Sequence, residues 1–178
     1  MNFSTIAEMR QSCRKYDPTR QVEQDKLDAI LATARLAPSA CNGQPYHITV
    51  CHGSVAKRIA ASTQSAGNNL FTSDAPIMLV ISEKPYNERA EKGAKAMSND
   101  YRSMDIGILA AYITAEATAQ GLGSCMIGWY EDVVLRDLCD VNEPIRLVIA
   151  LGYPSPDDYL RMKKRKSLDE LVSMKGDQ

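Results

Sequence analysis

The chain has 178 residues, of which 44% are apolar and 24% charged, and its net charge at pH 7 is −1. This length and composition are typical of one soluble globular domain, and the near-neutral charge argues against a general nucleic-acid-binding protein. No apolar run approaches the roughly 20 residues that cross a bilayer, and no signal-peptide pattern is present, so we expect a single cytoplasmic domain over residues 1–178.

The five cysteines include no C-x-x-C pair, and their odd number fits free thiols in a reducing compartment. His47 and His52 are five residues apart on or near one predicted strand, which points them to opposite faces and makes them a poor metal pair. Cys41 lies near Asn42 and His47 in the sequence, but no cysteine-nucleophile signature surrounds it. We therefore expect neither a metal site nor a thiol hydrolase.

The first third of the sequence predicts two helices and a strand. Residues 3–11 form a short helix, and residues 23–36 form an amphipathic helix that ends before Pro38. The first strand covers residues 47–51. The cap of the first helix is one of three polar residues, Asn2, Ser4 or Thr5. The core positions of the second helix are Leu27, Ile30, Leu31 and Ala34.

The middle of the chain contains the longest predicted elements. Ser54 caps a helix that runs to about residue 62, and the apolar run at residues 77–81 is a strand covered on both faces. Residues 83–100 are polar and form either a mobile cover over a pocket or a surface excursion. Residues 100–120 form the longest helix, which is apolar on more than one side and therefore buried. Its apolar stripe is Ile106, Leu109, Ile113 and Ala117.

The last third predicts two more strands, at residues 124–128 and 146–152, with a helix between them that begins near Asp132. We find no internal repeat and no second-domain boundary.

Residues 36–51, LAPSACNGQPYHITVC, join a helix to a strand through a loop of small and amide residues. The small side chains let a flat ligand approach the backbone, and Asn42 and Gln44 each offer a donor and an acceptor. A planar heterocycle with imide-like edges needs such a loop. An ordinary connection rich in turn formers has the same composition, so both interpretations remain open from spacing alone. The small residues are Ser39, Ala40 and Gly43.

Basic residues gather near both ends of the chain. Arg10 and Arg14 share a face if their segment is helical, with the Ser12 hydroxyl between them, and this set suits a phosphate. Residues 161–166 are almost all basic. Taken alone, the first pattern also fits a solvated helix end and the second a solvated segment.

Three segments together resemble the FMN-dependent nitroreductase family. APSACNGQPY, residues 37–46, resembles the family segment A-P-S-S-x-N-x-Q-P-[WY]. RQSCR, residues 10–14, matches R-x-S-x-[RK], and the ending G-Y-P…R-K-S-L-x-E-x-V is typical of the family. The resemblance spans residues 10 to about 172.

The resemblance implies an α+β fold. The family fold has a central mixed, mostly antiparallel sheet of four to five strands flanked by helices. It also implies an intertwined homodimer with FMN sites at the interface.

The activity implied by the resemblance is that of an FMN-dependent NAD(P)H oxidoreductase. Hydride would pass from NADH or NADPH through flavin N5 to an electron-poor small molecule, such as a nitroaromatic or a quinone, in a ping-pong sequence. FMN carries this chemistry, so no catalytic side chain is expected. A non-catalytic flavin-binding protein, a reductive dehalogenase and an enone reductase remain alternatives.

The resemblance also assigns cofactor-binding residues. Phe71 stands where some relatives carry a lysine. The residues implied for the phosphate and ribityl chain are Arg10, Gln11, Ser12, Arg14, Lys163 and Arg165, and Arg14 could also face N1 and O2 of the ring. Those implied for the ring are Pro38, Ser39, Ala40, Asn42, Gln44 and Asn68, with Ile127 and Gly128 beside N5.

Overall fold

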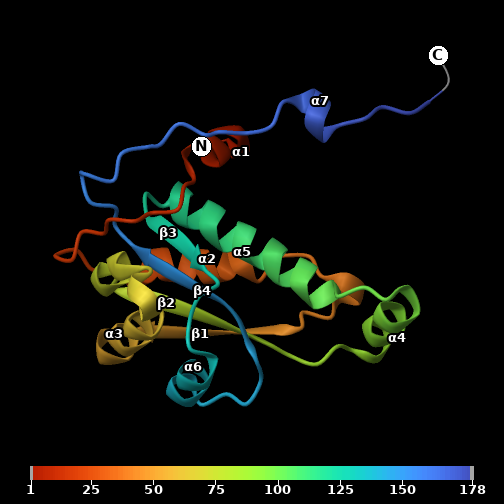
Figure 1. The fold of residues 1–178 in the computed structure, drawn as a ribbon, viewed down its shortest axis with the longest axis horizontal. Helices are drawn as coiled ribbons and strands as arrows, with labels where there is room; N and C mark the ends of the chain where they lie inside the picture. Colours follow the sequence, from red (N-terminus) through yellow and green to blue (C-terminus); the bar gives the residue numbers. More distant parts are fainter. Residues whose placement is uncertain (1, 177–178) are drawn as a thin grey trace.

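The computed structural model describes residues 2–176, which form a four-stranded antiparallel sheet with helices on both faces (Figure 1). The strand order is β1-β2-β4-β3. The strands are β1 (Tyr46–His52), β2 (Ile77–Glu83), β3 (Gly123–Ile127) and β4 (Ile145–Gly152). The expected mixed sheet is antiparallel at all three strand pairings, and parallel pairing is limited to one isolated bridge between Ser12 and Ser124.

The seven α-helices of the described residues vary widely in length. They are α1 (Phe3–Met9), α2 (Gln24–Ala34), α3 (Gly53–Ser62), α4 (Glu88–Met97), α5 (Tyr101–Ala119), α6 (Asp132–Cys139) and α7 (Leu168–Leu171). Three short 3-10 turns, η1 (Ala40–Asn42), η2 (Ser65–Gly67) and η3 (Leu70–Asp74), lie in the loops. No helix within residues 2–176 is long and apolar enough to span a membrane.

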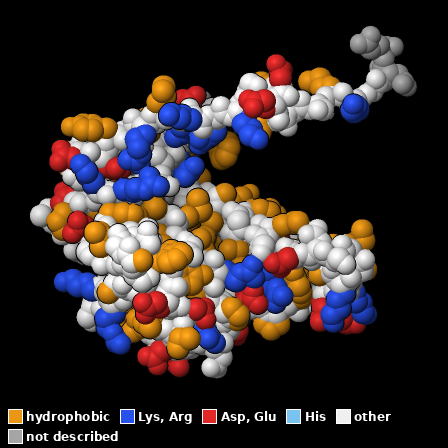
Figure 2. Space-filling view, viewed as in Figure 1, with side chains coloured by type: hydrophobic (Ala, Val, Ile, Leu, Met, Phe, Trp, Pro, Cys, Tyr) orange, Lys and Arg blue, Asp and Glu red, His pale blue; other side chains and the backbone are white. Residues whose placement is uncertain are grey.

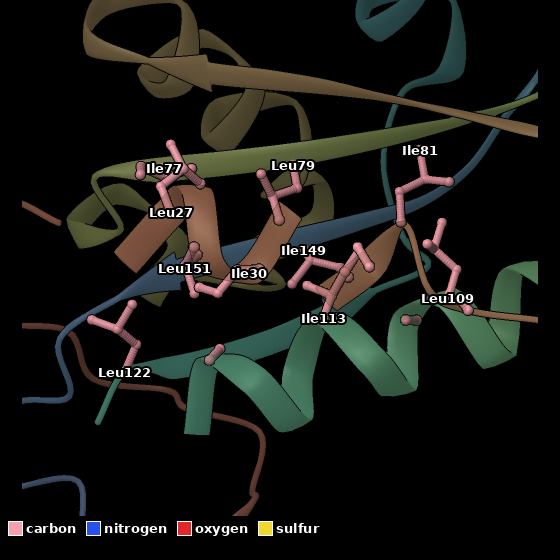
Figure 3. Close-up of a cluster of buried hydrophobic side chains, with 14 of the residues drawn as sticks. Leu27, Ile30, Ile77, Leu79, Ile81, Leu109, Ile113, Leu122, Ile149 and Leu151 are labelled. Carbon is pink, nitrogen blue, oxygen red and sulfur yellow. The ribbon is translucent and has the colours of Figure 1, made fainter. Parts of the chain in front are cut away.

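The sheet has one hydrophobic core on each face because alternate residues of its central strands point in opposite directions. On one face, Leu79 and Ile149 pack with α2 and α5 (Figure 3). On the other, Met78 and Val148 pack with Ile59 of α3 and with α6. The strand β2 is therefore buried on both sides, as its continuous apolar run predicts.

The structure settles one open helix cap, corrects one predicted helix start and fills one undecided segment. Asn2 is the cap of α1, since its Oδ1 accepts a hydrogen bond from the Thr5 amide at 2.9 Å. The cap residue of α3 is His52 and not Ser54, because the helix already begins at Gly53, whose φ is +61°. The polar residues 83–100 contain α4, a helix with two buried alanines.

The C-terminal segment leaves the sheet after β4, passes beside α1 and ends in α7, which lies away from the body of the molecule (Figure 1). Ser167 and Glu170 form a capping box on α7. The apolar side chains of this last stretch are exposed, namely Leu168, Leu171, Val172 and Met174.

The N-terminus of α5 predicts a stability term that depends on pH. Asp100 caps this helix, and hydrogen bonds from the Ser103 hydroxyl, then from Arg146 and Tyr86, lower its pKa to about 2. This pKa is below the usual aspartate value of about 3.9. The stability contributed by the Asp100 charge is therefore complete above about pH 3.9 and is lost as the pH falls toward 2.

We expect Asp100→Asn to lower the melting temperature at pH 7 and the difference from wild type to shrink between pH 4 and pH 2.5. Thermal unfolding followed by circular dichroism measures this difference. Asp157→Asn, at an exposed aspartate, is the matched control. A difference that stays constant with pH would contradict the role of the charge.

Candidate functional site

The two ends of the chain meet beside β3. The N-terminal segment pairs with the sheet, because Ser12 forms a bridge to Ser124 and the Cys13 amide donates to the Ser124 carbonyl at 2.9 Å. The C-terminal segment lies against the N-terminal one, since Lys163 Nζ donates to the carbonyl of Arg10 at 2.8 Å. Basic residues from both ends are thereby gathered in one place, as Figure 2 shows for the Lys and Arg side chains near α1.

Four of the gathered cations make no ion pair in the described residues, although the Glu8 carboxylate lies near enough to raise the pKa of Lys163. Within residues 2–176, no carboxylate lies within ion-pair distance of the four cationic side chains Arg10, Arg14, Lys163 and Arg165. The pKa of Lys163 is lowered, first by desolvation and then by repulsion from Arg10, Arg165 and Arg161. A bound anion would relieve this repulsion.

Arg14 and Ser12 lie on the side of this cluster that faces β3. Burial raises the pKa of the Cys125 thiol in β3, while the Arg14 charge and a hydrogen bond with Ser12 lower it. Ser12 lies beside the strand through its bridge to Ser124. Arg10, Lys163 and Arg165 are thus brought together, and Ser12 and Arg14 follow Arg10 along the segment beside β3. The Gln11 side chain is turned toward residues 158–161.

A second group of predicted residues lies where β3 ends. Ile127 is buried and Gly128 is exposed, so only the backbone of this pair can meet a ligand. Asn68 Nδ2 donates to the Ser65 carbonyl at 3.2 Å, and Trp129 Nε1 donates to the Ser65 hydroxyl at 2.8 Å. Ser65 therefore links Asn68 to the exit of β3, although the Asn68 amide is occupied by its own loop.

The third group is the loop between α2 and β1, which has a strained backbone. Cys41, Asn42 and Gln44 have positive φ values of 51°, 51° and 45°, a region that costs non-glycine residues about 1–3 kcal/mol each. The Gln44 amide donates to Ser39 Oγ at 2.9 Å, and the Gln44 side chain donates to Asn42. Pro38, Asn42 and Gln44 remain exposed, while Ser39 and Ala40 are half-buried.

Two residues absent from the sequence-based site hold this loop from outside. Asn87 caps α4 through Ala90 and donates from Nδ2 to the Cys41 carbonyl at 3.0 Å. Asp105 of α5 is 3% exposed and accepts the Ala40 amide at 3.0 Å through Oδ1. Asp105 is one of two carboxylates in the otherwise apolar α5, and a carboxylate so near the apolar stripe was a sequence signal for it, whereas nothing in the sequence marks Asn87.

The loop and the cation cluster do not form one site within a single chain. No hydrogen bond of the described residues joins residues 38–44 to residues 10–14 or 161–166. Figure 1 places the loop near the start of α5 and the cluster near its end, and a 19-residue helix is roughly 28 Å long. One chain therefore presents two separated parts of the predicted site.

An apolar face lies between these parts. A hollow of about 660 Å³ separates α1 from α5, and its lining includes Phe3, Ile6, Ala111 and Met126. The outward side of α5 also exposes Met104, Ile108 and Tyr112, at 52%, 37% and 36% of their surface. An apolar helix face of this kind is usually covered by another protein surface.

The thiols and carboxylates form no alternative centre in the described part of the chain. No three His, Cys, Asp or Glu side chains within residues 2–176 approach closely enough to hold a metal ion. Burial raises the pKa of Cys13 to about 12, which keeps this thiol protonated at neutral pH. Cys41 is exposed and makes no hydrogen bond to His47.

The chain matches known proteins over most of its length. The model of the Nitroreductase family matches residues 7–153. NADH dehydrogenase of Thermus thermophilus is 28% identical over 89% of this chain and 90% of its own length. Oxygen-insensitive NADPH nitroreductase of Helicobacter pylori is 23% identical over 88% and 90%.

A solved structure shares the fold of this chain over nearly its whole length. FMN-dependent nitroreductase from Clostridium difficile superposes with a TM-score of 0.76 at 25% identity, covering 96% of this chain and 98% of that one. The α+β fold implied by the sequence resemblance is confirmed by this match and by the antiparallel sheet.

The buried bond from Asp105 to the loop predicts a specific pattern of stability. Asp105→Ala removes a hydrogen bond to a charged acceptor and should lower the free energy of unfolding by about 1.5–3 kcal/mol. Asp105→Asn should recover most of this loss, because its carbonyl oxygen can still accept the Ala40 amide. Urea denaturation measures both variants, and an Asn variant no more stable than the Ala variant would contradict the assignment.

Proposed function

Because the chain belongs to the nitroreductase family, whose members similar to it are named as NAD(P)H-dependent oxidoreductases, we propose that it is an FMN-dependent oxidoreductase. Its electron donor would be NADH or NADPH, and its acceptor a small electron-poor molecule such as a nitroaromatic or a quinone. The five free thiols support a cytoplasmic location, where they would stay reduced.

The observation that carries the proposal is the uncompensated positive cluster made by both chain ends. Arg10, Arg14, Lys163 and Arg165 offer charged donors without an acidic partner in the described chain. A phosphate ester is the anion that this donor set fits best, because arginine binds phosphate oxygens through charge-assisted, often bidentate bonds. The donor set therefore fits the phosphate end of FMN.

The roles of the chain's residues follow from their places. The cluster would hold the phosphate, with the Ser12 hydroxyl beside it, and the exposed backbone of Gly128 would face the ring. FMN, when bound, supplies the two-electron redox chemistry. A cation such as Arg14 near the ring would stabilise negative charge better than water does, because the site has a lower dielectric constant.

We propose that a second copy of the chain completes the site. The loop of residues 38–44 lies at the far end of α5 from the cluster, so it would serve the flavin held by the partner. The apolar face between α1 and α5 would be buried between the two copies. The exposed apolar residues of the C-terminal segment support an intertwined arrangement, since burying such side chains against a second copy would stabilise the dimer.

The cluster predicts a phosphate-specific loss of affinity. Arg10→Ala and Arg14→Ala should each weaken FMN binding by about 1.5–3 kcal/mol, the contribution of a charged hydrogen bond. Arg10→Ala, at the phosphate end alone, should leave riboflavin binding nearly unchanged. Fluorescence titration of the flavin-free chain measures both ligands. Arg58→Ala, at an exposed position of α3, is the matched control. Full FMN affinity in the double variant would discard the phosphate assignment.

The shared site predicts that oligomeric state and flavin binding fail together. Ile108→Asp places a charge on the apolar side of α5 and should give monomers that retain little FMN. Val133→Asp, at a 72% exposed position on α6 away from that face, should remain a dimer. Light scattering with flavin absorbance reports both properties, and a monomer with stoichiometric FMN would refute the shared site.

A further inference from the structure

The Gln11 side chain joins the two terminal segments through both ends of its amide. Its Nε2 donates to the Tyr159 carbonyl at 3.1 Å and also lies 3.3 Å from Asp158 Oδ2. Its Oε1 accepts the backbone amide of Arg161 at 3.0 Å. Because a primary amide has two donor hydrogens, these contacts use its donors on residues 158 and 159 and leave none for a ligand.

Asp158 and Arg161 complete this set of contacts. The Asp158 side chain is only 3% exposed, and its Oδ1 pairs with the Arg161 guanidinium at 2.9 Å. The other terminal nitrogen of Arg161 donates to the Ser12 carbonyl. Arg161 is thus paired with a carboxylate, in contrast to Arg10, whose charge has no ion-pair partner in residues 2–176.

The C-terminal segment depends on such contacts for its position. Residues 158–166 form neither helix nor strand, so repeated backbone bonds do not fix their position. Side-chain bonds from Gln11 and Arg161, and from Lys163 to the Arg10 carbonyl, connect them to the N-terminal segment. The position of Lys163 and Arg165 in the cation cluster therefore depends on these bonds.

We infer that Gln11, Asp158 and Arg161 form a clamp that assembles the cation cluster before any ligand binds. Gln11 is a positioning residue, and its place within R-x-S-x-[RK] does not make it a flavin ligand. A cluster assembled in advance binds an anion more tightly, because less conformational entropy is lost on binding. The identity of that anion as a flavin phosphate rests on the proposed function, whereas the clamp itself does not.

Hydrogen exchange of the flavin-free full chain tests the clamp directly. The Arg161 amide is the donor to Gln11, so a peptide containing residues 159–163 should exchange slowly in the wild type compared with residues 172–176. Gln11→Ala should speed this exchange about tenfold, since local opening becomes easier. Gln11→Met keeps the length of the side chain without its hydrogen bonds and should also speed the exchange. Gln24→Ala, at an exposed position of α2, should leave it unchanged.

Titration with FMN and with riboflavin separates positioning from direct contact. Gln11→Ala should weaken FMN about tenfold through the loosened cluster and leave riboflavin unchanged. Equal weakening of both flavins would overturn the inference, since it would place Gln11 against the ring or ribityl chain. Residues 159–163 that are protected only after FMN is added would also overturn it. If the wild type binds no FMN but the exchange results hold, the clamp stands and the proposed function fails.

Discussion

Cations drawn from both ends of one chain lie close enough to repel one another, and the proposed site is built around them. The bond from Lys163 to the Arg10 carbonyl and the clamp around Gln11 hold like charges close together. The pKa of Lys163 is lowered, first by desolvation and then by repulsion from these charges. Such an arrangement stores unfavourable electrostatic energy unless an anion is present. The sheet holds the N-terminal half of this cluster in place, because Ser12 pairs with Ser124 of β3 and the Cys13 amide is hydrogen-bonded to the Ser124 carbonyl.

The long helix α5 determines how the parts of the site are shared. Its inner stripe, which includes Leu109 and Ile113, fills the core below the sheet, and Asp105 reaches from it to the strained loop. Its outer side is apolar and exposed. Since the loop and the cation cluster lie near opposite ends of this helix, one chain supplies parts of two proposed sites. The strain in the loop is held by Asn87 and Asp105, which lie outside the recognised motif.

The sequence predicted those elements whose signal is local. The unbroken apolar run of β2 and the stripe of α5 marked burial without any knowledge of the partners. The predicted cap of α3 was wrong by two residues, because the helix begins at Gly53 with a positive φ. No neighbouring residue predicts this conformation. The helix α4 stayed undecided, because its polar composition resembles that of a surface loop.

Within the site, the motifs identified residue types but not their separate roles. The pattern R-x-S-x-[RK] places Gln11 among the ligands, yet its partners lie about 150 positions away in the sequence, and only the fold reveals them. Asp105 and Asn87 are also long-range partners of the loop, 65 and 46 residues from it. By contrast, the gathering of Arg10 with Lys163 followed from the resemblance, because both ends carry family patterns.

The role of the cation cluster is tested by titrating the purified full chain with FMN and riboflavin at low and high salt. We predict one FMN per chain, an affinity that falls as salt screens the cluster, and much weaker binding of riboflavin. A chain that binds no FMN, or that binds both flavins equally at every salt concentration, would contradict the central role of the cation cluster.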